Sequence, residues 1–457
     1  MESFEISYVL FFYPFFRFEM ISNSFVYELI GVLIALAVVV GTYFKTSYKY
    51  WQRKGVPFIE PRFPLGNNLN PFNQKIANYE MVRRFYKYFK SEGHPFGGIY
   101  FITVPTMVLV DPDMIRNIMA KDFLHFTNRG TFYDEKNDPL SAHLFNLEGQ
   151  AWKNMRMKLT PTFTTGKMKM MFETLLTCGD QMIAYIDDLG ATKEPLNIKS
   201  ILMYFTTDVI GSCAFGIDCN SFKDKDSEFI KKGSQIFVNT LARKIRFLFI
   251  LGFPNLCKKL KLRVFEKHLS DFYLNVVKDT VRYREERTIR RNDFMQILLE
   301  MKKSDANKEG LTIEQIAAQS FVFFIAGFET SSTTMNFCLY ELARHQDIQE
   351  KLRNEIREVL AKHDGKLTYE GVMEMKYLGK VLDGKANFFF LIKYLYYTIH
   401  YQFVSISSTF SVFSLFLFLF VQFVLDSLKL SFFLNCETFV YLQANHVTSL
   451  RELNNII

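Results

Sequence analysis

The sequence predicts a mainly α-helical protein with a small β-sheet and an N-terminal membrane anchor. Residues Ile316 to Leu342 are apolar on nearly every side, which predicts a helix buried all round in a large helical core. Residues Leu29 to Phe44 contain no charged side chain, which is typical of a membrane segment. Residues Gly98 to Val110 are rich in β-branched and aromatic residues and predict a hairpin with its turn at Pro105-Thr106.

The N-terminal region predicts an uncleaved anchor over residues 20–50. Leu29 to Phe44 is slightly short of the ~20 residues that span a bilayer, and Phe25 to Tyr27 can complete the length at the interface. Basic residues follow, which place the next domain in the cytosol by the positive-inside rule. The basic residues are Lys45, Lys49, Arg53 and Lys54. The alternative to a membrane anchor is a helix buried in the core of the protein.

Two segments flank the anchor. Residues 1–19 are aromatic and interrupted by Pro14, so Met20 is the more natural start and the first residues are expected to be an upstream extension. Residues 51–67 contain three prolines and two glycines between Gly55 and Asn67, which predict a stiff hinge between anchor and domain.

Composition excludes several classes of site. The chain has 457 residues, of which 49% are hydrophobic, and its net charge of +8 is spread without a basic block of the kind that binds nucleic acid. Its six cysteines have no CxxC spacing and its eight histidines no HxxxH pair, so no zinc site is expected. The scattered cysteines indicate a reduced domain facing the cytosol.

The long helix begins with a capping box, because Thr312 is followed by Gln315. Inside it, Gly327 costs about 1 kcal/mol relative to Ala. One interpretation is a kink, with Thr330 bonding back to a carbonyl one turn earlier. The other is a groove, in which Gly327 admits a ligand while Glu329 and Thr330 supply an acid and a hydroxyl for proton delivery.

Three further patterns carry charge. Trp152 and Arg156 lie four residues apart, on one helix face, and by themselves indicate a cation–π contact or a core Trp beside a solvated Arg. Residues 241–263 have an apolar centre with basic flanks, which favours either core helices with solvated ends or a segment that enters lipid. Arg282 to Arg291 is expected to be a solvated connection between helices.

Several of these motifs together resemble the cytochrome P450 family. They are AGFETSS from Ala326, ELARHQDIQEKLRNEI from Glu341, and the Trp152 and Arg156 pair in EGQAWKNMRMKLTPTF. The sequence resembles the microsomal, xenobiotic-metabolising branch found in insects, and the resemblance runs over about residues 20–383. It implies a helical, partial P450 domain at residues 68–383.

The resemblance implies a haem-thiolate monooxygenase that inserts one oxygen atom from O2 into lipophilic substrates. Haem b is the implied cofactor, NADPH-cytochrome P450 reductase the electron donor, and the endoplasmic reticulum membrane the location, with the catalytic domain cytosolic. No nucleic acid partner is implied. The implied site residues are Trp152 and Arg156 at the haem propionates, Ala326 and Gly327 beside the iron, Glu329 and Thr330 as a proton relay, and Phe145, Phe321 and Phe324 as walls of the substrate pocket.

The resemblance stops after Asp383, where the family continues with a Glu-x-x-Arg helix and the loop of the axial cysteine. Residues 384–457 are instead rich in Phe and Leu. Phe410 to Leu425 could be an added membrane span. We favour a translated intron, because Gly384-Lys385 can be encoded by GGT-AAG, which contains the start of a splice donor.

The missing loop leaves no expected iron ligand. Cys436 lacks the Gly and Arg of such a loop, and Cys338 lies eight positions beyond Thr330, about 12 Å along the helix axis. No metal ligand is therefore assigned, and the chain as written is expected to be inactive. The alternative is a haem-free, membrane-anchored binding or decoy protein.

Overall fold

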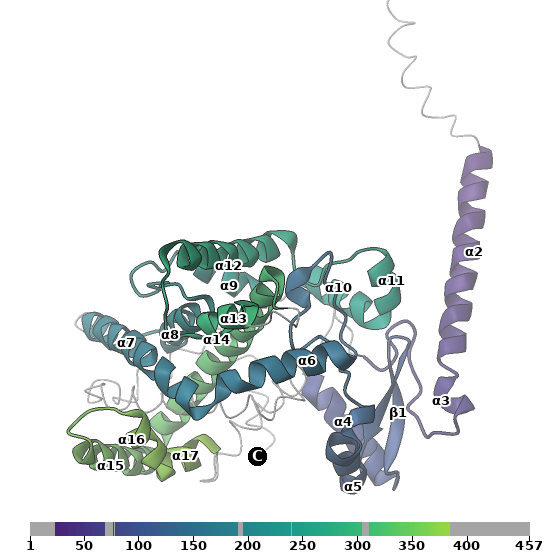
Figure 1. The fold of residues 1–457 in the computed structure, drawn as a ribbon. Helices are drawn as coiled ribbons and strands as arrows, with labels where there is room; N and C mark the ends of the chain where they lie inside the picture. Colours follow the sequence, from purple (N-terminus) through teal and green to yellow (C-terminus); the bar gives the residue numbers. More distant parts are fainter. Residues whose placement is uncertain are drawn as a thin grey trace, which may run out of the picture. The chain divides into compact units, whose positions relative to one another are not determined.

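The computed structural model describes residues 23–68, 76, 78–190, 195–238, 240–303 and 310–383 (Figure 1). Most of these residues are helical, and one antiparallel sheet of two strands accompanies them, which confirms the mainly α prediction. Residues 1–19 and 384–457, with Cys436, lie outside the described residues. The chain divides into two compact units, residues 1–126 with 241–253 and residues 127–240 with 254–457. Each unit is described by itself.

The first unit contains the apolar N-terminal helix and the sheet. Among the described residues, Tyr27–Ser47 is the one helix long and apolar enough to cross a membrane, with a mean hydropathy of 2.0 and 6% of it buried. The helices are α2 (Asn23–Ser47), α3 (Tyr50–Arg53), α4 (Asn78–Ser91), α5 (Pro112–Arg116), η1 (Asn117–Lys121), η2 (Phe123–His125) and α10 (Leu241–Gly252).

The hairpin forms where the sequence predicts it, but the predicted position of its turn is wrong. Strands β1 (Phe96–Phe101) and β2 (Val104–Leu109) pair antiparallel, and Pro105 lies opposite Tyr100 inside the ladder. The chain reverses at Ile102 and Thr103, and Ile102 has a φ of 58°. Pro105 fits β2 because this strand is at a sheet edge, where a missing N–H is tolerated.

The predicted hinge is attached to β1. The Trp51 Nε1 atom donates to the carbonyl of Ile99 over 2.9 Å, and the Asn67 side chain accepts a hydrogen bond from the Tyr100 N–H over 2.7 Å. These bonds hold both ends of residues 51–67 against the same strand.

The second unit is built around α14 (Ile313–Arg344). Its other helices are η3 (Pro139–Ser141), α6 (Gly149–Leu159), η4 (Thr160–Phe163), α7 (Thr165–Gly190), α8 (Ile198–Ile210), η5 (Gly211–Phe215), α9 (Glu228–Phe237), α11 (Pro254–Lys259), α12 (Lys267–Arg287), α13 (Phe294–Lys303), α15 (Gln346–Lys362), α16 (Tyr369–Glu374) and α17 (Lys376–Asp383).

Helix α14 confirms the predicted central position. Thr312 and Gln315 form the capping box in both directions. Phe321, Phe324 and Phe328 are fully buried, and their burial removes from water a large apolar area. Helix α8 packs along α14, where the Thr206 hydroxyl donates to the carbonyl of Phe328 over 3.2 Å.

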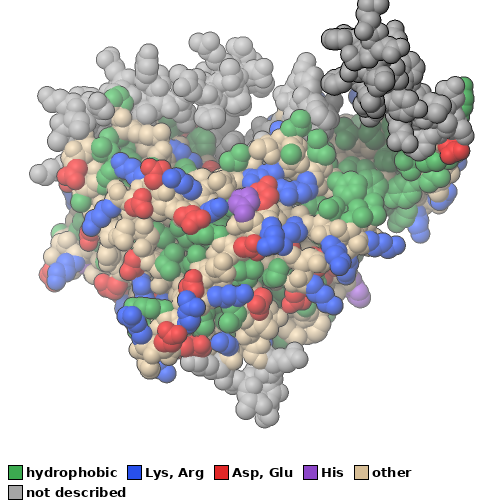
Figure 2. All heavy atoms as spheres, turned by 90° about the horizontal axis from the view of Figure 1, so that it is seen from above, with side chains coloured by type: hydrophobic (Ala, Val, Ile, Leu, Met, Phe, Trp, Pro, Cys, Tyr) green, Lys and Arg blue, Asp and Glu red, His purple; other side chains and the backbone are tan. Residues whose placement is uncertain are grey.

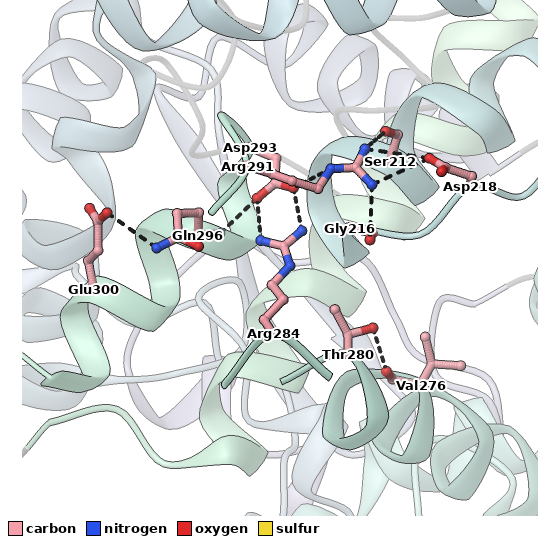
Figure 3. Close-up of polar contacts among 10 residues, drawn as sticks. All are labelled: Ser212, Gly216, Asp218, Val276, Thr280, Arg284, Arg291, Asp293, Gln296 and Glu300. Atoms are coloured by element: carbon pink, nitrogen blue, oxygen red, sulfur yellow. Dashed lines mark hydrogen bonds and ion pairs between the residues drawn. The ribbon is translucent and has the colours of Figure 1, made fainter. Parts of the chain in front are cut away.

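The expected solvated connection at Arg282 to Arg291 is wrong for residues 282–287, which are helical, and the side chain of Arg284 is buried. Helix α12 continues to Arg287, and the Arg284 side chain, 3% exposed, forms a bidentate ion pair with Asp293 (Figure 3). Arg291 lies on the other side of the same carboxylate, and its Nη2 atom donates to the Ser212 hydroxyl over 2.8 Å. A buried carboxylate must be paired, and Asp293 has both guanidinium groups as partners.

Candidate active site

The predicted Trp152 and Arg156 pair lies on one face of α6. Trp152 is buried, with 5% of its surface exposed, and the Arg156 guanidinium lies 5.5 Å from the centre of its ring. This is the cation–π contact that the spacing allows. The indole N–H and the guanidinium are both hydrogen-bond donors, a combination suited to carboxylates.

A second guanidinium belongs to the same cluster. Arg129 donates from Nη1 to the carbonyl of Phe145 over 2.9 Å, and its guanidinium lies 4.6 Å from the centre of the Phe145 ring. Burial, and then the positive charge of Arg156, lower the pKa of Arg129 to about 10. Two cations whose charges interact in this way favour the binding of anionic groups. We call Arg129, Trp152 and Arg156 the cationic cluster.

No pattern in the sequence selects Arg129. It lies 23 residues before Trp152, in the loop Asn128-Arg129-Gly130, at no helical spacing from it. The Asn128 side chain fixes this loop on α6 by accepting a hydrogen bond from the Gly149 N–H over 2.8 Å. Only the folded loop therefore brings the two arginines together.

Ala326 and Gly327 line an apolar cavity of about 100 Å³. Its walls come from η4, α7, α8, η5, α13 and α14. A Cβ at Gly327 would lie 2.4 Å from Cδ1 of Ile210, so this glycine also permits the close packing of α8 on α14. Thr330 donates through Oγ1 to the carbonyl of Ala326, the bond one turn back that the kink interpretation expects.

The carboxylate of Glu329 has hydrogen-bond partners other than the Ala326 carbonyl that Thr330 contacts. The Glu329 carboxylate accepts hydrogen bonds from Lys199 of α8 over 3.0 Å and from the Thr333 hydroxyl over 3.1 Å. Both side chains of the Lys199 and Glu329 pair are about one-third exposed, at 32% and 35%. No motif or spacing in the sequence points to Lys199.

The three predicted pocket phenylalanines lie in different surroundings. Phe145 stacks on Arg129 of the cationic cluster. Phe321 and Phe324 are fully buried, 4.9 Å and 5.4 Å from Tyr273 of α12, measured between ring centres. Phe323, which lies between them in the sequence, lines the cavity. The substrate role of the three predicted residues stays a prediction.

Comparison with known proteins decides the family. The family model for cytochrome P450 matches residues 61–383. The chain belongs to the cytochrome P450 family. It is similar to Cytochrome P450 6a2 of Drosophila melanogaster, 40% identical over 379 residues that cover 81% of this chain and 75% of that relative. It is also similar to Probable cytochrome P450 6a20 of the same species, 43% identical over 361 residues that cover 78% and 72%.

Membership in the P450 family makes this chain a relative of haem monooxygenases of the insect type. It confirms the resemblance drawn from the motifs around Trp152 and Ala326. The cationic cluster offers donors that fit the carboxylates of haem. The described residues therefore include a chemically suitable site for the haem carboxylates.

The described cysteines do not fit the iron. Cys178, Cys213, Cys257 and Cys338 are buried. Burial raises the pKa of Cys213 and of Cys338 to about 12, and it raises the pKa of Cys178, Cys219 and Cys257 as well. Burial therefore disfavours the thiolate, which is the form that ligates a metal.

Proposed function

We propose that this chain is a membrane-anchored P450 that keeps the haem carboxylate site and the α14 proton-transfer residues but does not complete the monooxygenase reaction. In a complete relative, thiolate-ligated haem supplies the activation of dioxygen. Here the cationic cluster would bind the haem carboxylates, and Glu329 and Thr330 would hold protons beside the groove at Ala326. The lipophilic substrate class follows from the family alone.

The state of the cysteines carries this proposal. A thiolate needs a positive or polar environment that lowers its pKa. In the described ranges burial raises the pKa of each cysteine, and at Cys178 and Cys213 it outweighs the positive charge of Arg291. Cys338 is fully buried on α14, which agrees with a packing role.

The endoplasmic reticulum membrane is the proposed location. Helix α2 exposes apolar side chains along its length, among them Val32, Ile34 and Val38, and all three are more than half exposed. Helix α10, in the same unit, exposes Ile245 and Phe247 next to basic residues. Figure 2 shows hydrophobic side chains gathered toward the right of the view with Lys and Arg beside them.

This arrangement favours lipid contact for α10 over the alternative of a core helix with solvated ends. Phe253, which follows α10, lies 6.3 Å from Tyr43 and 6.5 Å from Phe44 of α2, measured between ring centres. Apolar side chains at lipid with cations near the head groups are typical of interfacial helices. Orientation by the basic residues after α2 would place the second unit in the cytosol, where NADPH-cytochrome P450 reductase is the proposed electron donor.

Reconstitution tests the proposal. The purified chain is mixed with hemin in lipid vesicles, reduced under carbon monoxide, and assayed for substrate oxidation with NADPH and the reductase. We expect neither the difference band of a thiolate-ligated haem nor NADPH-dependent oxidation. Either signal would contradict the proposal. Loss of that signal in the Cys338→Ser variant would then identify Cys338 as the iron ligand. A Drosophila relative from the comparison serves as the positive control.

Sequencing of transcripts across Asp383 tests the proposed origin of residues 384–457. Under the intron hypothesis, most transcripts replace these codons with a Glu-x-x-Arg helix and a cysteine loop. Transcripts that mostly run through Gly384-Lys385 to a stop codon would contradict it.

A further inference from the structure

The Lys199 ammonium is surrounded by oxygen atoms of α14. Its Nζ atom lies 3.0 Å from Oε1 of Glu329, 2.9 Å from Oγ of Ser332 and 2.6 Å from Oγ1 of Thr333. An ammonium has three N–H donors. All three therefore have acceptors, and every acceptor belongs to α14.

The position of Lys199 is unfavourable for α8 itself. Asn197 is the N-cap of this helix and accepts a hydrogen bond from the Ser200 N–H, so Lys199 lies in the first turn. A cation at this end is opposed by the helix dipole. Burial also lowers the pKa of Lys199, and the charge of Glu329 acts against this lowering. The contact with α14 is thus what stabilises a charged Lys199 here.

The same contact determines where the acid lies. Glu329 is held by Lys199 and by Thr333, while the neighbouring Thr330 hydroxyl donates to the carbonyl of Ala326. The acid and the hydroxyl, although adjacent in sequence, are thus bonded to different groups.

We propose that Lys199 is a positioning residue for the α14 acid, holding the Glu329 carboxylate at the first turn of α8, with hydrogen-bond partners different from that of the Thr330 hydroxyl. Proton transfer from Glu329 to the groove at Ala326 then requires this ion pair to open. Because the pair is one-third exposed, it also links solvent to the acid. The inference rests on the role of Glu329 given under Proposed function.

Carboxylate footprinting tests this without haem. The full chain in lipid vesicles is treated with a carbodiimide and glycine ethyl ester, and the modification rate of each Asp and Glu is read by mass spectrometry. We expect Lys199→Met to raise the rate at Glu329 by about fivefold, the factor given by about 1 kcal/mol. Lys199→Arg, which keeps the charge, should restore the slow rate. An unchanged rate at Glu329 in Lys199→Met would overturn the proposal.

A second ion pair on α14 provides the matched control. Lys278 of α12 lies 4.0 Å from Glu314 of α14, and both side chains are about half exposed. Because exposed pairs contribute little, Lys278→Met should leave the rate at Glu314 nearly unchanged.

General unfolding is distinguished by the pattern of modification. If Lys199→Met raises the modification rates of all carboxylates alike, the Lys199→Arg variant distinguishes unfolding from positioning. A wild-type modification rate of Glu329 in Lys199→Arg supports positioning. A rate equal to that of Glu329 in Lys199→Met overturns the proposal. Since no haem is present, this outcome is independent of the reconstitution experiment, so failure of one proposal is distinguishable from failure of the other.

Discussion

The Nη2 atom of Arg284 lies only 2.0 Å from the point where a Cβ at Gly216 would be. Gly216 also has a φ of 69°, in the left-handed region that favours glycine. The chain turns here at the end of η5, and the buried guanidinium passes directly against its backbone. Position 216 thus requires glycine for two reasons, one conformational and one steric.

Gly216→Ala should therefore lower the free energy of unfolding by about 2 to 4 kcal/mol, because left-handed strain and overpacking both act. Gly130→Ala is the matched control, since Gly130 has the same φ of 69° but no heavy atom within 4 Å of the point where its Cβ would be. It should cost about 1 kcal/mol. Denaturant unfolding followed by circular dichroism measures both. Equal losses would show that Arg284 does not restrict the site.

Arg284→Met should cost about 3 to 5 kcal/mol, because it leaves the Asp293 carboxylate buried beside Arg291 alone. The exposed pair of Arg282 and Asp279, 2.7 Å apart, is the control. Arg282→Met should change stability by less than about 1 kcal/mol. Urea midpoints of the two variants test this, and a small loss in Arg284→Met would mean that Arg291 suffices for Asp293.

His143 should make the protein sensitive to mild acid. Burial, and then the charge of Arg129, lower its pKa from 6.5 to about 3. The unfolded chain binds the proton first, so stability is full above pH 6.5 and falls as the pH drops toward 3. The slope from this residue is about 1.4 kcal/mol per pH unit.

His143→Gln should reduce this slope between about pH 6 and pH 4. Asn146, whose Nδ2 atom lies 3.4 Å from Nε2 of His143, can bond to the amide instead. Unfolding curves at a series of pH values measure the slope. An identical slope in wild type and variant would show that other groups cause the acid sensitivity.

The cationic cluster should bind hemin through its carboxylates. Arg129→Met and Arg156→Met should each weaken hemin binding by about tenfold, since a charge-assisted hydrogen bond contributes about 1.5 to 3 kcal/mol. Hemin dimethyl ester, which has no free carboxylate, should bind weakly and equally to wild type and variants. Quenching of Trp152 fluorescence measures the affinities. Equal affinities for hemin and its ester would exclude the cluster as the carboxylate site.

Elements with local signals can be predicted from the sequence. The capping box at Thr312, the buried character of α14 and the apolar α2 all follow from spacing and composition. The P450 family follows as well, because the motifs around Trp152 and Ala326 are contiguous. Even so, the predicted turn at Pro105 is wrong, since an edge strand accepts a proline that local rules assign to a turn.

Contacts between distant residues depend on the tertiary structure. Arg129 joins Arg156 across a loop, Lys199 reaches Glu329 from another helix, and Arg284 is buried despite its place in a charged run. The physical reason is the same in all three cases. A charge is stabilised by partners far away in sequence, and no local propensity or period records a contact that only folding creates.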